Sequence, residues 1–215
     1  MRQTGYRKIS GFYIIRKYCY NNNGTKEDIF MEGKNVIAVT NRKLCKRPFL
    51  EVIEDLAKKD LKTIVLREKD LSPEKYEDLA KQCLKICEKY GASLTLHNFI
   101  SVARKLGVKR IHLPYPMFLK EAGDLSDFES VSTSIHKPEE AEQAQKAGAD
   151  FVFAGHIFAT DCKKGLKPRG LEFLKKTVEA VDIPVYGIGG IKEENFEEIL
   201  KTGAYGGCIM SGFMN

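Results

Sequence analysis

One histidine, His156, stands where an apolar run gives way to a polar loop. The run over residues 151–154 has the composition of a buried strand. The loop after it is polar and cationic and contains Thr160, Asp161, Cys162 and Lys163. An imidazole gains and loses protons near neutral pH, so it can act as an acid or a base. The pattern predicts a proton-transfer residue at a strand end, although a histidine in such a place is more often structural.

A glycine-rich segment further along the chain has the composition of an anion site. Residues 185–191 run from an apolar strand into glycines and then a helical pattern. Glycine lets the backbone approach a ligand closely, and N–H groups near a helix start attract phosphate. We therefore expect Gly189, Gly190 and Ser211 to bind a phosphate at the last two strand ends, with ordinary turn chemistry as the alternative.

Further polar residues follow other apolar runs. Arg67 and Lys69 come after residues 63–66. They would share one face if the strand continued through them, and could then clamp a carboxylate. A solvated charge cluster is the alternative. His136 could orient a substrate carboxylate or cap a helix, and His112 is expected in the core or packed at a strand end. The remaining candidates at strand ends are His97, Asn98 and Ser134.

These side chains must be positioned by a repeating βα pattern that begins near residue 35. Strands are predicted over residues 36–39, 63–66, 93–96, 110–113, 130–133, 151–154, 184–187 and 207–210. Helical patterns separate most of them, and the near-continuous apolar strands are typical of sheets covered on both faces. About eight such units predict a (β/α)8 TIM barrel, whose active site lies at the C-terminal strand ends. The closing C-terminal helix is expected to be truncated or absent, and an open doubly wound sheet is the alternative fold.

Length and composition predict one barrel domain over residues 34–215. The chain has 215 residues, of which 43% are hydrophobic and 30% charged, as suits a single α/β domain. Residues 1–33 show no clear period and contain a loop signal at residues 21–24. We interpret them either as an appended arm or as translated upstream sequence with the natural start at Met31, and assign them no function.

Charge and cysteine usage exclude several classes of function. The net charge is +6, but basic residues alternate with acidic ones, which favours a solvated surface or a small anionic substrate over nucleic acid. No apolar run reaches the 18 residues of a membrane span. The six cysteines form no C-x-x-C pair, which is typical of reduced thiols in a cytoplasmic protein.

From about residue 35 to residue 213, the chain resembles the thiamine phosphate synthase/TenI family. The segments LREK at 66–69, SIH at 134–136, YGIGGI at 186–191 and IMSG at 209–212 match the whole family. The segment GHIFATDCKKGL at 155–166, with Arg169 and Gly170, matches its TenI-type thiazole tautomerase branch. The resemblance implies a TIM barrel.

The resemblance also separates two chemistries. Thiamine phosphate synthases join a pyrimidine pyrophosphate to a thiazole phosphate and need Mg²⁺. Their pattern has an Asn-Asp pair after strand three, a Gly-Gln-x-Asp-like turn after strand four, and proline in place of His156. Here Asn98 precedes Phe99, and the turn after strand four is Pro114-Tyr115-Pro116-Met117. The resemblance therefore implies an isomerase with no cofactor and no metal ligands.

The tautomerase reaction converts a carboxythiazole phosphate tautomer into the aromatic carboxythiazole phosphate. The resemblance implies that His156 is catalytic and that Gly190, Met210 and Ser211 bind the phosphate. The ring and carboxylate would be surrounded by Arg67, Lys69, Asn98, Ser134, His136, Thr160, Asp161, Cys162 and Lys163. The family also suggests a homodimer. The alternatives are a divergent Mg²⁺-dependent thiamine phosphate synthase and a non-catalytic paralogue that binds a phosphorylated ligand.

Overall fold

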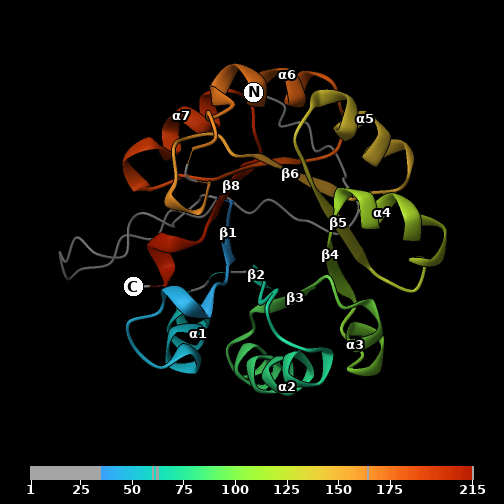
Figure 1. Cartoon of the computed structure of the whole chain (residues 1–215), viewed down its shortest axis with the longest axis vertical. Helices are drawn as coiled ribbons and strands as arrows, with labels where there is room; N and C mark the ends of the chain where they lie inside the picture. Colours follow the sequence, from blue (N-terminus) through green and yellow to red (C-terminus); the bar gives the residue numbers. More distant parts are fainter. Residues whose placement is uncertain (1–34, 60, 62, 164, 215) are drawn as a thin grey trace, which may run out of the picture.

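Eight parallel strands close into a barrel in which each strand pairs with its neighbours in the chain and β1 pairs with β8. The computed structural model describes residues 35–59, 61, 63–163 and 165–214, and its helices surround the ring of strands (Figure 1). The strands are β1 (Val36–Val39), β2 (Thr63–Leu66), β3 (Ser93–His97), β4 (Arg110–Pro114), β5 (Ser130–Ile135), β6 (Phe151–Gly155), β7 (Val185–Ile188) and β8 (Gly206–Ile209). The predicted (β/α)8 TIM barrel is confirmed.

Seven α-helices follow the strands in the described residues, and α2 has a capping residue at each end. They are α1 (Phe49–Lys58), α2 (Pro73–Tyr90), α3 (Ile100–Lys105), α4 (Tyr115–Glu121), α5 (Pro138–Lys146), α6 (Gly170–Glu179) and α7 (Phe196–Lys201). At the start of α2, the Ser72 hydroxyl accepts a hydrogen bond from the Lys75 N–H at 3.4 Å. At its end, Gly91 has a φ of 73°, a left-handed conformation that glycine adopts without strain.

The structure differs from the predicted elements mainly at their ends. The helical segment between β7 and β8 begins as the 3-10 turn η5 (Glu193–Asn195) and becomes α-helical only at Phe196. Strands β3 and β5 each continue beyond their predicted last residue. After β8, the described residues form the 3-10 turn η6 (Ser211–Phe213) in place of a closing helix.

Two layers of apolar side chains fill the protein. Residues such as Leu66, Leu96 and Ile111 point outward and pack under the helices. The alternate residues point inward, and the barrel interior is filled by Ile37, Val39, Val65, Phe151, Phe153, Tyr186 and Cys208. Because side chains alternate along a strand, His97 next to Leu96 and His112 next to Ile111 belong to the inward set.

The arm predicted over residues 1–33 lies outside the described residues. Within the part of the chain that the structure describes, no helix combines the length and hydrophobicity that crossing a bilayer requires.

Candidate active site

Two histidines lie side by side inside the barrel near its C-terminal end. His97 on β3 pairs in register with His112 on β4. Their ring centroids are 5.7 Å apart and the planes differ by 29°. Only 5% of His97 and 2% of His112 is exposed. Phe153 stacks on His112 at 4.3 Å, so apolar contacts fix the plane of the second ring.

Serine hydroxyls bind both nitrogens of the His112 ring. Nδ1 lies 2.8 Å from Ser132 Oγ, and Nε2 lies 2.8 Å from Ser134 Oγ. The Ser132 hydroxyl donates to the Ile111 carbonyl at 3.5 Å, so we assign the ring proton to Nδ1, which donates to Ser132. Nε2 then accepts from Ser134. The Ser134 oxygen keeps its lone pairs free to accept further hydrogen bonds.

Three cations of two different loops lie close enough for their charges to interact. The pKa of Lys69 is lowered by partial burial first, and then by the positive charges of Arg67 and Lys163. Burial first, and then the charges of Lys69 and Arg67, lower the pKa of His97. Strand β2 ends at Leu66, so the condition that the strand continues through Arg67 and Lys69 is not met, and the turn after β2 brings them together. These positive charges attract a small anion.

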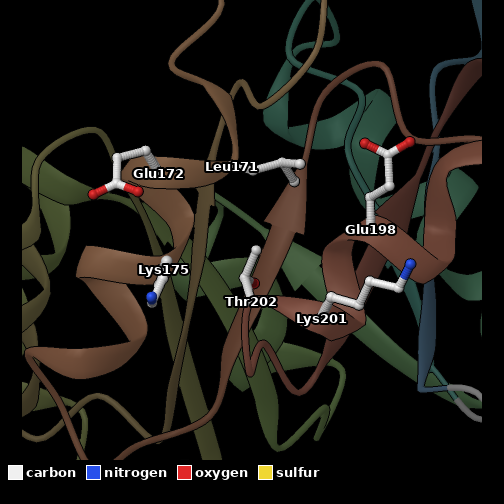
Figure 2. A pocket seen from close by; sticks show the side chains of 6 residues that line it. All are labelled: Leu171, Glu172, Lys175, Glu198, Lys201 and Thr202. Atoms are coloured by element: carbon white, nitrogen blue, oxygen red, sulfur yellow. The ribbon is translucent and has the colours of Figure 1, made fainter.

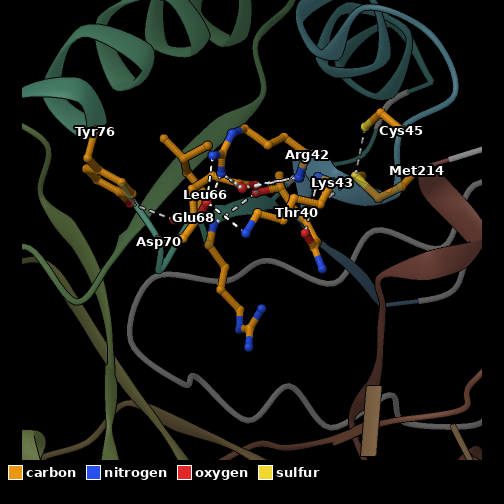
Figure 3. A network of polar contacts seen from close by, with 11 residues as sticks. Thr40, Arg42, Lys43, Cys45, Leu66, Glu68, Asp70, Tyr76 and Met214 are labelled. Atoms are coloured by element: carbon orange, nitrogen blue, oxygen red, sulfur yellow. Dashed lines mark hydrogen bonds and ion pairs between the residues drawn. The ribbon is translucent and has the colours of Figure 1, made fainter. Parts of the chain in front are cut away.

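The buried carboxylate of Glu68, to which sequence reasoning assigned no role, organises the turn after β2 (Figure 3). Its Oε1 accepts from the Thr40 hydroxyl at 2.7 Å and from the Arg42 backbone N–H at 3.0 Å. Its Oε2 lies 3.1 Å from Arg42 Nη1. Arg42 also forms two hydrogen bonds to the Asp70 carboxylate, at 2.6 and 2.7 Å. Glu68 thus ties the β1 end to the loop that carries Arg67 and Lys69.

Tyr76 of α2 joins the ends of β2 and β3. Its hydroxyl donates to the Leu66 carbonyl at 2.6 Å and accepts from the His97 backbone N–H at 2.9 Å. Burial raises the pKa of this phenol above its ordinary value, so Tyr76 stays protonated and both hydrogen bonds persist. The backbone positions of Arg67 and His97 therefore depend on one side chain of α2.

His156 follows β6 directly, as predicted. The Gly155–His156 peptide bond is cis, and the ring Nε2 lies 3.4 Å from the Leu166 carbonyl oxygen. His156 is partly exposed, so its ring is not enclosed in the packed interior. The Arg169 Nε donates to the Gly155 carbonyl at 2.9 Å, and this bond holds the far end of the loop against the end of β6.

Backbone hydrogen bonds join the loop after β6 to the glycines after β7. Ile157 N–H donates to the Ile188 carbonyl at 2.9 Å, and Phe158 N–H donates to the Gly189 carbonyl at 3.0 Å. A Cβ atom at Gly190 would lie 2.5 Å from the Ala159 carbonyl oxygen. Only glycine allows this approach, which places His156 beside the predicted phosphate-binding segment.

The predicted phosphate-binding residues follow adjacent strands. Ile188 of β7 pairs with Cys208 of β8, so the residues that follow the two strands meet at one edge of the barrel. Gly189 and Gly190 have φ values of 96° and 68°. Ser211 is exposed at the start of η6, directly after Met210. The structure therefore brings Gly190, Met210 and Ser211 to the same side of the barrel mouth.

The remaining predicted residues lie at other strand ends. The loop after β6 contains Thr160 and the 3-10 turn η4 (Asp161–Lys163), in which Asp161, Cys162 and Lys163 are exposed. Asn98 follows β3 with a φ of 76°. His136 lies exposed before α5, and its backbone N–H donates to Glu140 Oε2 at 2.6 Å. His136 is therefore anchored through its backbone to α5.

The described residues do not fit a Mg²⁺ site. They contain no group of three or more His, Cys, Asp or Glu side chains arranged to hold a metal ion. Asn98 and Phe99, directly after β3, and Tyr115, Pro116 and Met117, directly after β4, supply no carboxylate, whereas Mg²⁺ is usually bound through one or two carboxylates and phosphate oxygens. The buried carboxylate at this end, Glu68, is already engaged by Thr40 and Arg42.

A hollow of about 200 Å³ opens in the helical layer between α6 and α7 (Figure 2). Its lining consists of Leu171, Glu172, Lys175, Glu198, Lys201 and Thr202. None of these residues follows a strand end. We therefore place the candidate site at the barrel mouth and not in this hollow.

The buried histidines predict a loss of stability in mild acid. Burial, with the charges of Lys69 and Arg67, lowers the pKa of His97 to about 3, and burial lowers that of His112 as well. As pH falls from about 6.5 towards 3, the unfolded chain binds protons that the folded protein does not. The free energy of unfolding should then fall by about 1.4 kcal/mol per pH unit for each histidine.

Urea unfolding at about pH 7 and about pH 5.5 measures this slope. His97→Leu removes one of the two histidines, so the free energy of unfolding should change with pH by about 1.4 kcal/mol per pH unit less than in the wild type. A variant with the wild-type slope would contradict the assignment of His97 as a buried neutral imidazole.

Fold and site together define an α/β-barrel enzyme with an anion-attracting mouth. The profile of the TMP-TENI family, described as thiamine monophosphate synthase, matches residues 36–213. The chain belongs to this family.

Known proteins agree with this assignment. The chain is 36% identical over 185 residues to a putative thiamine-phosphate synthase 2 of Aquifex aeolicus, covering 86% of this chain and 100% of the relative. It is 32% identical to a thiamine-phosphate synthase of Pyrococcus horikoshii, covering 86% and 89%. A thiamine phosphate pyrophosphorylase structure from Pyrococcus furiosus superposes with a TM-score of 0.71 at 28% identity, covering 84% and 87%. These synthase names do not separate the synthase and tautomerase branches.

Proposed function

We propose that this family member is a metal-independent thiazole tautomerase, which aromatises a carboxythiazole phosphate tautomer. One observation carries the proposal: the residues directly after β3 and β4 offer no carboxylate for Mg²⁺, while an imidazole, His156, follows β6. Pyrophosphate displacement needs a cation to stabilise the leaving group. Proton transfer needs only a positioned acid or base.

In this proposal, His156 moves a proton onto or off the bound heterocycle. Gly190, Met210 and Ser211 hold the phosphate at the β7–β8 edge. The cations Arg67 and Lys69 and the Ser134 oxygen face the ring and the carboxylate, together with Asn98, His136 and the loop residues Thr160, Asp161, Cys162 and Lys163. Aromatisation is downhill, so an acid or base worth about 10²–10⁴-fold supplies a sufficient mechanism.

A thiamine phosphate synthase is the second candidate, and the names of the curated relatives favour it. It would condense a pyrimidine pyrophosphate with a thiazole phosphate and release pyrophosphate in the presence of Mg²⁺. A non-catalytic protein that binds a phosphorylated ligand is a third candidate. A homodimer is also proposed for this chain, and light scattering of the purified protein tests it.

Two parallel assays separate the candidates. In the first, the carboxythiazole phosphate tautomer is incubated with the protein and a chelator, and aromatic absorbance is followed. In the second, pyrimidine pyrophosphate and thiazole phosphate are supplied with Mg²⁺, and pyrophosphate release is measured. We expect aromatisation that survives chelation and no condensation above background. Condensation abolished by the chelator would establish the synthase, and turnover in neither assay would leave the binding protein.

A further inference from the structure

The Nδ1 atom of His97 is buried and has no hydrogen-bond partner among the described residues. Only 5% of this residue is exposed. A buried polar atom without a partner costs free energy, and such atoms in folded proteins are normally paired. The proton-transfer and phosphate-binding roles proposed above do not use His97, so its unpaired nitrogen needs a separate explanation.

The His97 ring is held in place before any ligand arrives. Its backbone N–H is fixed by the Tyr76 hydroxyl at 2.9 Å, and its ring stacks against that of His112. It is the last residue of β3, and the preceding residue, Leu96, pairs with Leu66 of β2. Arg67, which follows Leu66, thus lies at the same level of the barrel as His97. A side chain fixed in this way loses little freedom when it binds a ligand.

The charges around His97 favour an anionic ligand group next to its ring. Arg67 and Lys69 are close enough to lower the pKa of His97, after the larger effect of burial. His97 is therefore neutral at neutral pH and carries one ring N–H. An anionic oxygen attracted by Arg67 and Lys69 can accept that N–H, and the neutral ring adds no further positive charge to the cluster.

We propose that His97 contacts the substrate and donates a ring N–H to its carboxylate. The carboxylate is favoured over the phosphate because His97 ends β3 beside the turn after β2 that carries Arg67, whereas the proposed phosphate site follows β7 and β8. This inference rests on the proposed function, which supplies a substrate with both anions. It makes His97 a specificity-determining residue that recognises the carboxylate through a hydrogen bond.

Two substitutions, one apolar and one polar, test the inference. His97→Leu removes the ring nitrogens at similar size, and His97→Asn keeps a polar amide near the position of Nδ1. Calorimetry would compare two ligands, the aromatic carboxythiazole phosphate and the thiazole phosphate without a carboxyl group. We expect His97→Leu to weaken binding of the carboxylated ligand by about tenfold or more and to leave the other ligand unchanged. His97→Asn should restore part of the loss.

Thermal unfolding of the ligand-free variants distinguishes a ligand-binding role of His97 from a purely structural one. Since leucine removes an unpaired buried polar atom, the Tm of His97→Leu at neutral pH should equal or exceed that of the wild type. A lower Tm with an unchanged preference for the carboxylated ligand would overturn the inference and assign His97 a structural role.

The failure of the inference and of the proposed function can be told apart. If wild-type protein aromatises the tautomer while His97→Leu keeps the full preference for the carboxylated ligand, only the role of His97 is wrong. If wild-type protein binds neither ligand, the proposed function is wrong and the inference falls with it.

Discussion

Replacing His156 with alanine should lower turnover of the carboxythiazole phosphate tautomer by about 10²–10⁴-fold, the usual contribution of one positioned acid or base. The loss should appear in kcat and only weakly in the affinity for the aromatic product, because the proposed phosphate contacts follow β7 and β8 and the proposed cations Arg67 and Lys69 follow β2. Initial rates of aromatic absorbance, measured with a chelator present, and calorimetric binding of the product give the two quantities.

External imidazole distinguishes proton transfer from a structural role of His156. A small imidazole can enter the space left by alanine at this partly exposed position and carry the proton in its place. We expect the rate of His156→Ala to rise with imidazole concentration and that of wild-type protein to stay constant. A His156→Ala variant with more than about a tenth of the wild-type rate would remove His156 from the mechanism.

The barrel could be predicted from sequence because each of its units is local. Alternating apolar runs and helical patterns place all eight strands to within one or two residues, and Ser72, Pro73 and Gly91 mark the ends of α2. The strand ends then bring Gly190 and Ser211 together through the topology of the barrel. None of this depends on which side chains meet across the barrel.

The contacts that sequence reasoning missed are long-range. Glu68 binds Arg42, which lies 26 positions earlier, and His97 stacks on His112 of the next strand. Such pairs depend on strand register and on the path of the loop after β1, neither of which has a local pattern in the sequence. The one available signal for Glu68 was an acidic residue between two cations directly after a strand.

The positions of Arg67 and Lys69 depend on the turn after β2 and not on the strand itself. Alternation along β2 was the expected reason, but β2 ends at Leu66. The turn that follows is shaped by buried Glu68, and the Thr40 hydroxyl accepts a hydrogen bond from the Arg67 backbone N–H at 2.9 Å. The cation pair therefore depends on a carboxylate to which sequence reasoning assigned no role.

Glu68→Ala should lower the free energy of unfolding by about 3 kcal/mol, within the range for breaking a buried ion pair. Only 1% of the Glu68 side chain is exposed. Its loss leaves the Thr40 hydroxyl and the Arg42 backbone N–H without the acceptor that both now use. Glu68→Gln keeps the shape and one acceptor oxygen, so its effect should be smaller. Urea unfolding at neutral pH measures both variants.

Asp70→Asn is the matched control, because it removes a carboxylate from the same guanidinium at the surface. Asp70 holds two hydrogen bonds from Arg42, but 38% of its side chain is exposed, and exposed ion pairs contribute little to stability. Its effect should be much smaller than that of Glu68→Ala. Equal effects of the two variants would show that the surface pair, and not the buried carboxylate, holds the loop after β1 against the loop that carries Arg67 and Lys69.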